Sequence, residues 1–286
     1  MLYTTGFTIT KATGQVVDFS ENKLRKSLQH SGANKEEIDR VLKYVLANAY
    51  DKIPSKQVYK LAYKKLKNIK TVFASKYKLK KAIYQLGPSG FPFEHLVANI
   101  LNKSGYTTKV GEIIKGKCVK HEIDVLAKDK EKYVAIECKF HSNDDYICNI
   151  RIPLYIHSRY HDLKKGWNRS TPLKEVWIVT NTRFSSDAIE YSQCNGIKLL
   201  SWNYPENNGI KKRMNDLGFY PITVLTLLTK DEKQQLLKQN VVLCHELIQN
   251  HYLLNKIGVH EKRKQKIISE IKELCHKIED KETKNH

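Results

Sequence analysis

Acidic residues are scarce in this chain of 286 residues, which has 30 of them against 50 lysines and arginines and a formal net charge of +20. Such an excess predicts a polyanionic partner. The deficit is greatest between residues 52 and 81, which hold eleven lysines and no aspartate or glutamate. A segment of this kind favours contacts with phosphate groups, although a solvated lysine-rich face is the alternative interpretation.

Three other features are missing. The six cysteines form no CxxC pair and no paired zinc spacing, and we expect no disulfides. No run approaches the roughly 18 apolar residues of a membrane span. The N-terminus has neither the basic start nor the apolar core of a signal peptide. We therefore expect a cytoplasmic protein with no membrane partner.

Two short segments alternate apolar and charged residues, as strands do when one face lies on a core. They are His121–Val125 and Ile136–Lys139, and the polar run Lys128–Lys132 lies between them. A chain reversal in the middle of that run predicts an antiparallel hairpin in which paired residue numbers add up to 261.

In this register Asp124 lies opposite Glu137, and the two-residue period of a strand puts Lys139 on the face of Glu137. Carboxylates held this close repel unless a cation joins them, and oxygen ligands favour Mg²⁺ or Mn²⁺. For one such strand, a solvated charged face is the alternative. The pair of strands predicts a phosphoryl-transfer site.

A third acidic residue, Glu94, follows Gly90–Phe93 at the start of an apolar-periodic helix. Together with the Asp124 strand and Glu137-x-Lys139, this order resembles the PD-(D/E)XK nucleases, specifically the Mrr-like type IV restriction endonucleases. Many Mrr proteins carry glutamine where this chain has Glu137. The resemblance spans about residues 87 to 205, and the segments similar to the family's later strand, helix and strand are Glu175–Asn181, Phe184–Ala188 and Gly196–Leu200.

The resemblance implies an αβββαβ core that hydrolyses phosphodiester bonds of DNA, most simply double-stranded DNA, as a homo-oligomer. Asp124, Glu137 and the backbone carbonyl of Cys138 would hold Mg²⁺ or Mn²⁺. Glu94 would complete the metal site and orient a metal-bound water. Lys139 would position the attacking water or help to deprotonate it.

The N-terminal third predicts two short strands, Phe7–Lys11 and Val16–Phe19, and then a helix capped by Ser20. Further helical patterns cover Lys35–Tyr50 and Ser55–Leu66. From about residue 5 to 86 this order resembles the ATP-cone, a domain that senses ATP and dATP in ribonucleotide reductases and their transcriptional repressors.

Three residues fall on positions that the ATP-cone uses around its nucleotide: Lys11, Gly14 and Lys23. The resemblance implies that ATP or dATP binds as an effector and is not hydrolysed. Gly14 by itself is equally well explained as a turn residue. Ala12 departs from the family, which often has arginine there.

One motif is predicted to be a decoy. Residues Gly111–Cys118 nearly match a P-loop, with Cys118 in place of the Ser or Thr that holds Mg²⁺. A P-loop also needs a helix at this point, whereas Val119–Val125 is strand-like. The segment therefore predicts two strands joined by a basic turn.

A helix is predicted over Asn149–Lys165, and Arg151, Tyr155 and Arg159 would share one face of it. That face would meet DNA or a dimer partner, or remain an ordinary surface.

Beyond Pro221, helices are predicted from Thr229 and over Val241–Leu254, followed by a break at Gly258. This region loosely resembles a helix-hairpin-helix, and a dimerisation tail is the alternative.

The chain is thus predicted to have an α/β (α+β) fold in three parts: an ATP-cone (1–86), an Mrr-like endonuclease domain (87–220) and a helical extension (221–286). The predicted function is restriction or defence cleavage of DNA, regulated by ATP or dATP. Two alternatives stay open: a nucleotide-responsive DNA-binding regulator that does not cleave, and a structure-selective repair nuclease.

Overall fold

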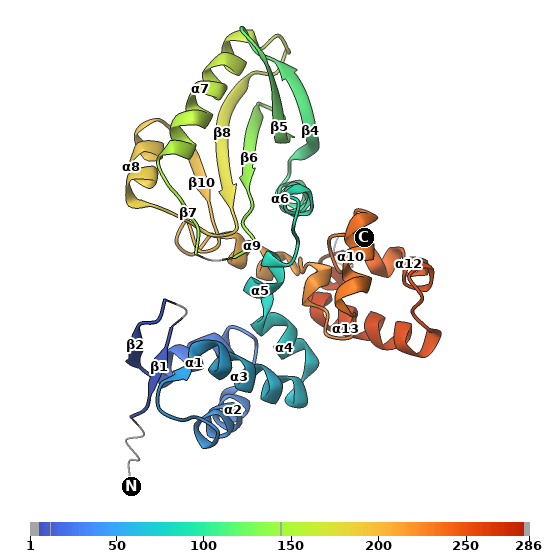
Figure 1. Cartoon of the computed structure of the whole chain (residues 1–286). Coiled ribbons are helices and arrows are strands. Elements are labelled where there is room, and N and C mark those ends of the chain that lie inside the picture. Colours follow the sequence, from blue (N-terminus) through green and yellow to red (C-terminus); the bar gives the residue numbers. More distant parts are fainter. Residues whose placement is uncertain (1–5, 12, 144, 283–286) are drawn as a thin grey trace. The chain divides into compact units, whose positions relative to one another are not determined.

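The computed structural model describes residues 6–11, 13–143 and 145–282, and side chains as far as residue 275. Ala12, the departure from the ATP-cone pattern, lies outside the described residues. The chain divides into two compact units, of which one comprises residues 1–80 and 224–228 and the other residues 81–223 and 229–286. Both contain helices and strands, which confirms the predicted α/β class (Figure 1).

The first unit joins a small sheet to helices. Strand β1 pairs antiparallel with β2 and parallel with β3. Leu28, Val41 and Leu66 are fully buried in the core under the helices. The elements are β1 (Thr8–Thr10), β2 (Val16–Asp18), α1 (Glu21–Gln29), α2 (Lys35–Ala47), β3 (Ile53–Pro54), α3 (Ser55–Ile69) and α4 (Thr71–Tyr77).

Local signals explain where these helices begin. The Ser20 hydroxyl accepts a hydrogen bond from the Lys23 backbone N–H at 3.4 Å, as the sequence predicts. Asn34 and Glu37 form a reciprocal capping box at the start of α2. The predicted strands and the helices near 35–50 and 55–66 are therefore confirmed.

The second unit is built on a five-stranded sheet of order β10-β8-β6-β5-β4. Strands β4, β5 and β6 form an antiparallel meander, and β6, β8 and β10 run parallel. Parallel neighbours need crossover connections, which α7 and α8 supply. The elements are α6 (Phe91–Lys103), β4 (Thr107–Lys115), β5 (Lys120–Lys128), β6 (Tyr133–Lys139), α7 (Arg151–Gly166), β8 (Leu173–Thr180), α8 (Ser186–Cys194) and β10 (Lys198–Leu200).

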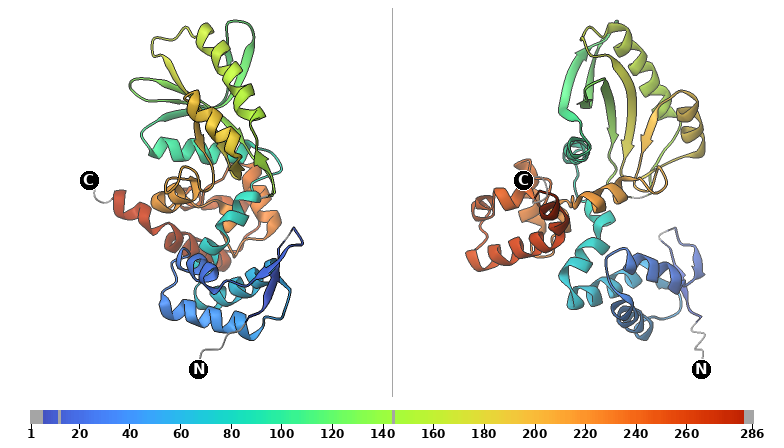
Figure 2. Two further views of the ribbon diagram at one scale, coloured as in Figure 1. Left: turned by 90° about the vertical axis from the view of Figure 1, so that its left-hand side faces the viewer. Right: turned by 180° about the vertical axis from the view of Figure 1, so that it is seen from behind.

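Helices cover both faces of this sheet (Figures 1 and 2). Ile156 of α7 and Ala188 of α8 share a core with Ile178 of β8. Helix α6 packs on β4 and β5 through an apolar side that includes the fully buried Phe93 and Leu96. Both faces of β6 are therefore buried, so the predicted αβββαβ core is confirmed but the charged face of β6 is not a solvated one.

The predicted hairpin register is confirmed. Val125 pairs with Ile136, and the ladder runs to Lys128 opposite Tyr133, so each pair of residue numbers adds up to 261. The chain reverses at residues 129 to 132, where the Asp129 carboxylate accepts hydrogen bonds from two backbone N–H groups.

The P-loop-like segment contains no helix, as predicted, but the end of β4 and the turn that leads to β5. Asp162 of α7 holds this turn by accepting hydrogen bonds from the backbone N–H groups of Cys118 and Val119, and His121 Nε2 lies 2.8 Å from its Oδ2. These hydrogen bonds keep the pKa of Asp162 well below its ordinary value, the largest cause being the bond with His121.

A separate two-stranded parallel sheet, which the sequence did not predict, is formed by β7 (Ile147–Cys148) and β9 (Arg183–Phe184).

In the C-terminal region, the helix predicted from Thr229 is confirmed as α10 (Lys230–Lys238), with a capping box between Thr229 and Glu232. None of the helices described in this structure is long and apolar enough to span a membrane.

The single helix predicted over Val241–Leu254 is confirmed only in part, because the helical residues begin at Glu246 and a break follows Gln249. Asn240 has a φ of +60°, and Leu243 forms a bridge with Pro221. The Glu246 carboxylate accepts hydrogen bonds from the N–H groups of Val242 and Leu243, and both residues lie outside the helices. Two short helices follow, α11 (Glu246–Gln249) and α12 (Tyr252–Lys256), and then the long α13 (Glu261–Glu282).

Candidate active site

Strands β5 and β6 stop pairing where the predicted acidic residues begin. The last ladder pair is Val125 with Ile136, one residue before Asp124 and Glu137. Asp124 Oδ2 instead accepts a hydrogen bond from the Cys138 backbone N–H at 2.7 Å. On the other side of β5, the register places Gly111, with a φ of +68°, across from Asp124. The sheet is thus opened locally on both sides of Asp124.

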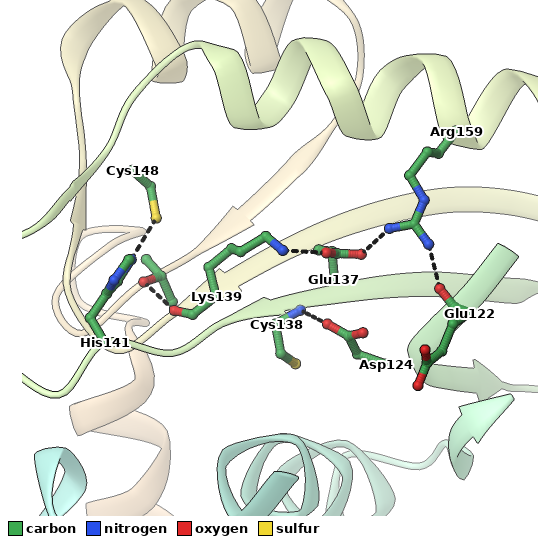
Figure 3. Close-up of polar contacts among 9 residues, drawn as sticks. Glu122, Asp124, Glu137, Cys138, Lys139, His141, Cys148 and Arg159 are labelled. Atoms are coloured by element: carbon green, nitrogen blue, oxygen red, sulfur yellow. Dashed lines mark hydrogen bonds and ion pairs between the residues drawn. The ribbon is translucent and has the colours of Figure 1, made fainter. Parts of the chain in front are cut away.

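Glu137 lies on β6 with only 7% of its surface exposed, and each of its carboxylate oxygens has a cationic partner. Lys139 Nζ lies 2.5 Å from Oε1, and Arg159 Nη1 lies 2.7 Å from Oε2. Figure 3 shows Glu137 between these two cations, with Arg159 reaching it from α7. The predicted placement of Glu137 and Lys139 on one face is therefore what the structure has.

Arg159 is the functional candidate whose place the sequence did not reveal. Its second nitrogen, Nη2, donates to the backbone carbonyl of Glu122, so one guanidinium joins α7, β5 and β6. The prediction put Arg159 on a helix face toward DNA or a partner, but its side chain is only 16% exposed. Helical spacing was the sequence signal that could have shown this burial, since Arg159 lies on the same side of the helix as the buried Ile156 and Leu163.

The carboxyl group of Glu94 interacts electrostatically with the carboxylates of the hairpin. It lies in the first turn of α6, which begins after Gly90 and has Pro92 near its start. Burial raises the pKa of Glu94 to about 7, with further contributions from the charges of Asp124 and Glu122. The structure therefore brings Glu94 to the hairpin, as predicted.

The other titrating groups respond to the same crowding. Burial raises the pKa of Asp124 to about 6, and the Glu137 charge adds to the shift, against the Cys138 N–H and the Lys139 charge. Burial lowers the pKa of Lys139, but its hydrogen bond with Glu137 and the charges of Glu137 and Asp124 together outweigh burial, so the pKa is raised. Lys139 is consequently an ammonium at neutral pH.

The donor chemistry of this cluster fits a hard divalent cation. Glu94, Asp124 and Glu137 are carboxylates, and like-charge repulsion contributes to the raised pKa values of the first two. Within the described residues, however, no three His, Cys, Asp or Glu side chains are already arranged around a metal position. Glu137 would have to give up a cationic partner to accept one.

Two histidines near the motif have supporting contacts. His121 is bonded to Asp162, and His141 stacks on Tyr146 with ring centroids 4.8 Å apart. Burial lowers the pKa of His141, and the Lys139 charge lowers it further. Neither arrangement directs an imidazole at Asp124 or Glu137.

The residues predicted around a nucleotide lie in the first unit. Gly14 has a φ of +81° and closes the turn between β1 and β2 through a hydrogen bond to the Lys11 carbonyl. The Lys11 ammonium lies 3.0 Å from Gln15 Oε1, and Lys23 is exposed in the first turn of α1. Gly14 therefore has a structural reason to be glycine that needs no ligand.

Comparison with known proteins identifies the family. An uncharacterised protein of Archaeoglobus fulgidus is 36% identical over 180 residues, which are 62% of this chain and 99% of that protein. A family model for the AF1548-like C-terminal region matches residues 220–275. This chain belongs to the AF1548-like family. The crystal structure of AF1548, a protein of unknown function, aligns with a TM-score of 0.55 and 33% identity over 66% of this chain and 99% of that one.

A second family model, described as restriction endonuclease, matches residues 116–204 of this AF1548-like chain. The matched range contains Asp124, Glu137, Lys139 and Arg159, whereas Glu94 precedes it. The resemblance to Mrr-like nucleases is thereby supported from β5 to β10, including α7, whereas β4 precedes the matched range. The chain carries a restriction endonuclease domain.

Proposed function

We propose that this protein is a metal-dependent endonuclease that hydrolyses phosphodiester bonds of double-stranded DNA. The observation that carries the proposal is the meeting of Asp124, Glu137 and Lys139 at one opening of the sheet, inside the range that matches restriction endonucleases. Glu94 adds a third carboxylate from α6. A restriction or defence role follows from the same match and is part of the proposal.

Asp124, Glu137 and the Cys138 carbonyl would hold Mg²⁺ or Mn²⁺, with Glu94 beside them. When bound, the ion would lower the pKa of water and polarise the phosphate. A water oxygen forms a bond to phosphorus, the bond from phosphorus to the leaving oxygen breaks, and the leaving oxygen takes a proton from solvent. Asp124 and Glu137 would thus hold the positive charge of the ion where the phosphate needs it.

Proton transfer falls to Glu94 and not to Lys139. Glu94 supplies a carboxylate beside the proposed metal position, and a carboxylate can accept a proton from the attacking water. Lys139 remains protonated because its pKa is raised, so it orients the water and offsets the negative charge that develops on phosphorus.

The first unit supplies a surface suited to DNA. Four exposed lysines of α3 follow one another at intervals of four, four and three residues, which places them along one side of the helix. We call this the lysine ridge, and its members are Lys56, Lys60, Lys64 and Lys67. Helix α3 contains no acidic residue to neutralise the ridge. Phosphate groups are the partner that such a ridge favours.

Nucleotide regulation is the second part of the proposal. The hairpin β1–β2 followed by helices α1 to α4 has the order of elements of an ATP-cone, and Lys11 and Lys23 are exposed cations in it. ATP or dATP would bind there as an effector and would not be hydrolysed.

The test is plasmid cleavage by the purified protein in Mg²⁺ or Mn²⁺, with no nucleotide, with ATP and with dATP. Glu137→Ala removes a proposed metal ligand, and Lys165→Gln, an exposed position on α7, is the matched control. Cleavage that needs the metal and is absent in Glu137→Ala supports the proposal. Binding of DNA without cleavage in either metal would support the DNA-binding regulator. Preferential cleavage of branched DNA would support the structure-selective repair nuclease.

A further inference from the structure

Arg159 and Glu137 form a contact that a metal-binding carboxylate cannot keep. Glu137 has two oxygens, and Lys139 and Arg159 each take one of them at 2.5 and 2.7 Å. Resting on the nuclease function proposed above, we propose that Arg159 is a phosphate-binding catalytic residue, held by Glu137 until a divalent ion takes that carboxylate. Its guanidinium is then free to bind the scissile phosphate.

The surroundings make the contact more than a surface ion pair. The side chains of Glu137 and Arg159 are 9% and 16% exposed, and a small cavity beside them is lined by apolar residues such as Ile156 and Leu163. Lys139 already supplies one cation to Glu137 from the same strand. Arg159 brings a second positive charge to this carboxylate, which a phosphate can take over once the contact with Glu137 breaks.

Arg159 also lies next to an exposed aromatic ring. Its guanidinium lies 5.4 Å from the ring centroid of Tyr155, which is 58% exposed, so an aromatic surface continues from Arg159 toward solvent. The guanidinium presents paired N–H donors that match two oxygens of a phosphate, whereas an ammonium acts as a point charge. Movement of Arg159 would also release its hydrogen bond to the Glu122 carbonyl.

If Arg159 and the metal exchange at Glu137, replacing Arg159 should change metal binding and cleavage in opposite directions. In the absence of DNA, Arg159 competes with the metal for Glu137, so its removal should tighten metal binding. In the presence of DNA, the phosphate loses its guanidinium, so cleavage should fall. A residue that only holds α7 on the sheet would weaken both, because its loss would loosen Glu137.

The experiment compares wild type with Arg159→Gln, Arg159→Lys and the control Lys165→Gln. Mn²⁺ binding without DNA is measured by calorimetry, and cleavage is measured with saturating Mn²⁺. We expect Arg159→Gln to bind Mn²⁺ about tenfold more tightly, since a hydrogen-bonded charged competitor is removed. We expect its cleavage to fall by about 100-fold or more, as when one donor to a developing oxyanion is lost.

Arg159→Lys retains a charge but not the paired donors, so it should regain less than a tenth of the lost cleavage, and Lys165→Gln should match wild type in both assays. Weaker Mn²⁺ binding by an Arg159→Gln protein that melts at the wild-type temperature would overturn the proposal, and so would unchanged cleavage. Absence of cleavage in the wild type would count against the proposed nuclease function alone. The Mn²⁺ titration without DNA would still test the exchange at Glu137.

Discussion

Asp124 Oδ2 accepts a hydrogen bond from the backbone N–H of Cys138 at 2.7 Å, at the point where β5 and β6 no longer pair. A side chain thus replaces the ladder bond that the main chain of β5 would otherwise supply. The same carboxylate has a pKa of about 6 because it is buried beside Glu137. The hydrogen bond of Asp124 therefore stabilises the folded state, whereas its buried charge destabilises it. Substitutions can separate these two effects.

Asp124→Asn keeps an acceptor oxygen for Cys138 and removes the charge. We expect its free energy of unfolding at pH 8 to equal or exceed that of wild type, while cleavage falls by about 100-fold or more. Asp124→Ala leaves the N–H of Cys138 without its acceptor and should lower the free energy of unfolding by about 1–3 kcal/mol. Urea denaturation and plasmid cleavage measure the two effects, and wild-type cleavage by Asp124→Asn would contradict the assigned role.

Stability should depend on pH through Glu94 and Asp124. Their pKa values in the folded protein, about 7 and about 6, lie above the ordinary values of 4.5 and 3.8. Between these limits the folded state binds more protons than the unfolded state, so the free energy of unfolding should fall as pH rises from about 4 to about 7. Glu94→Gln should flatten the upper part of this curve. Urea denaturation in metal-free buffer checks it, and an unchanged slope in Glu94→Gln would exclude Glu94 as the source.

Metal binding should release protons near neutral pH. At pH 6.5 a fraction of Glu94 and Asp124 is protonated, and a divalent cation favours the ionised carboxylates. The observed enthalpy of Mn²⁺ binding should therefore change with the ionisation enthalpy of the buffer, and this dependence should vanish near pH 8.5. Calorimetry in two buffers measures it, and Glu94→Gln should release fewer protons. A buffer-independent enthalpy at pH 6.5 would mean that neither carboxyl binds the ion.

The lysine ridge should determine part of the salt dependence of DNA binding. Each lysine that contacts a phosphate contributes about 0.9 to the slope of log K against log salt, so replacing all four by glutamine should reduce the slope by up to about 3.6. Fluorescence anisotropy of a labelled duplex at several salt concentrations gives this slope. The comparison protein replaces three exposed lysines of α13, Lys262, Lys266 and Lys272. A larger change in that protein would locate the main contact outside α3.

Much of the site could be predicted because its signals are local. Alternating side chains and a polar turn determine the register that puts Asp124 one step beyond the last pair of the β5–β6 ladder. Helix starts at Ser20 and Thr229 follow from side chains that bond to N–H groups three residues away. The start predicted at Val241 failed for a different reason, since Leu243 forms a bridge with Pro221, a residue distant in the sequence that no local signal reveals.

The sequence by itself determined the two strands of the β5–β6 hairpin, their register and the identity of three charged residues in it, because these depend on neighbours within a few positions. Only the tertiary structure decided that Arg159 contacts Glu137 and that the charges of Glu94 and Asp124 interact. These contacts join residues that are 22 and 30 positions apart, and they exist because α7 and α6 pack on opposite faces of one sheet. Packing brings the helices to the hairpin, and burial then shifts the pKa values that give the site its chemistry.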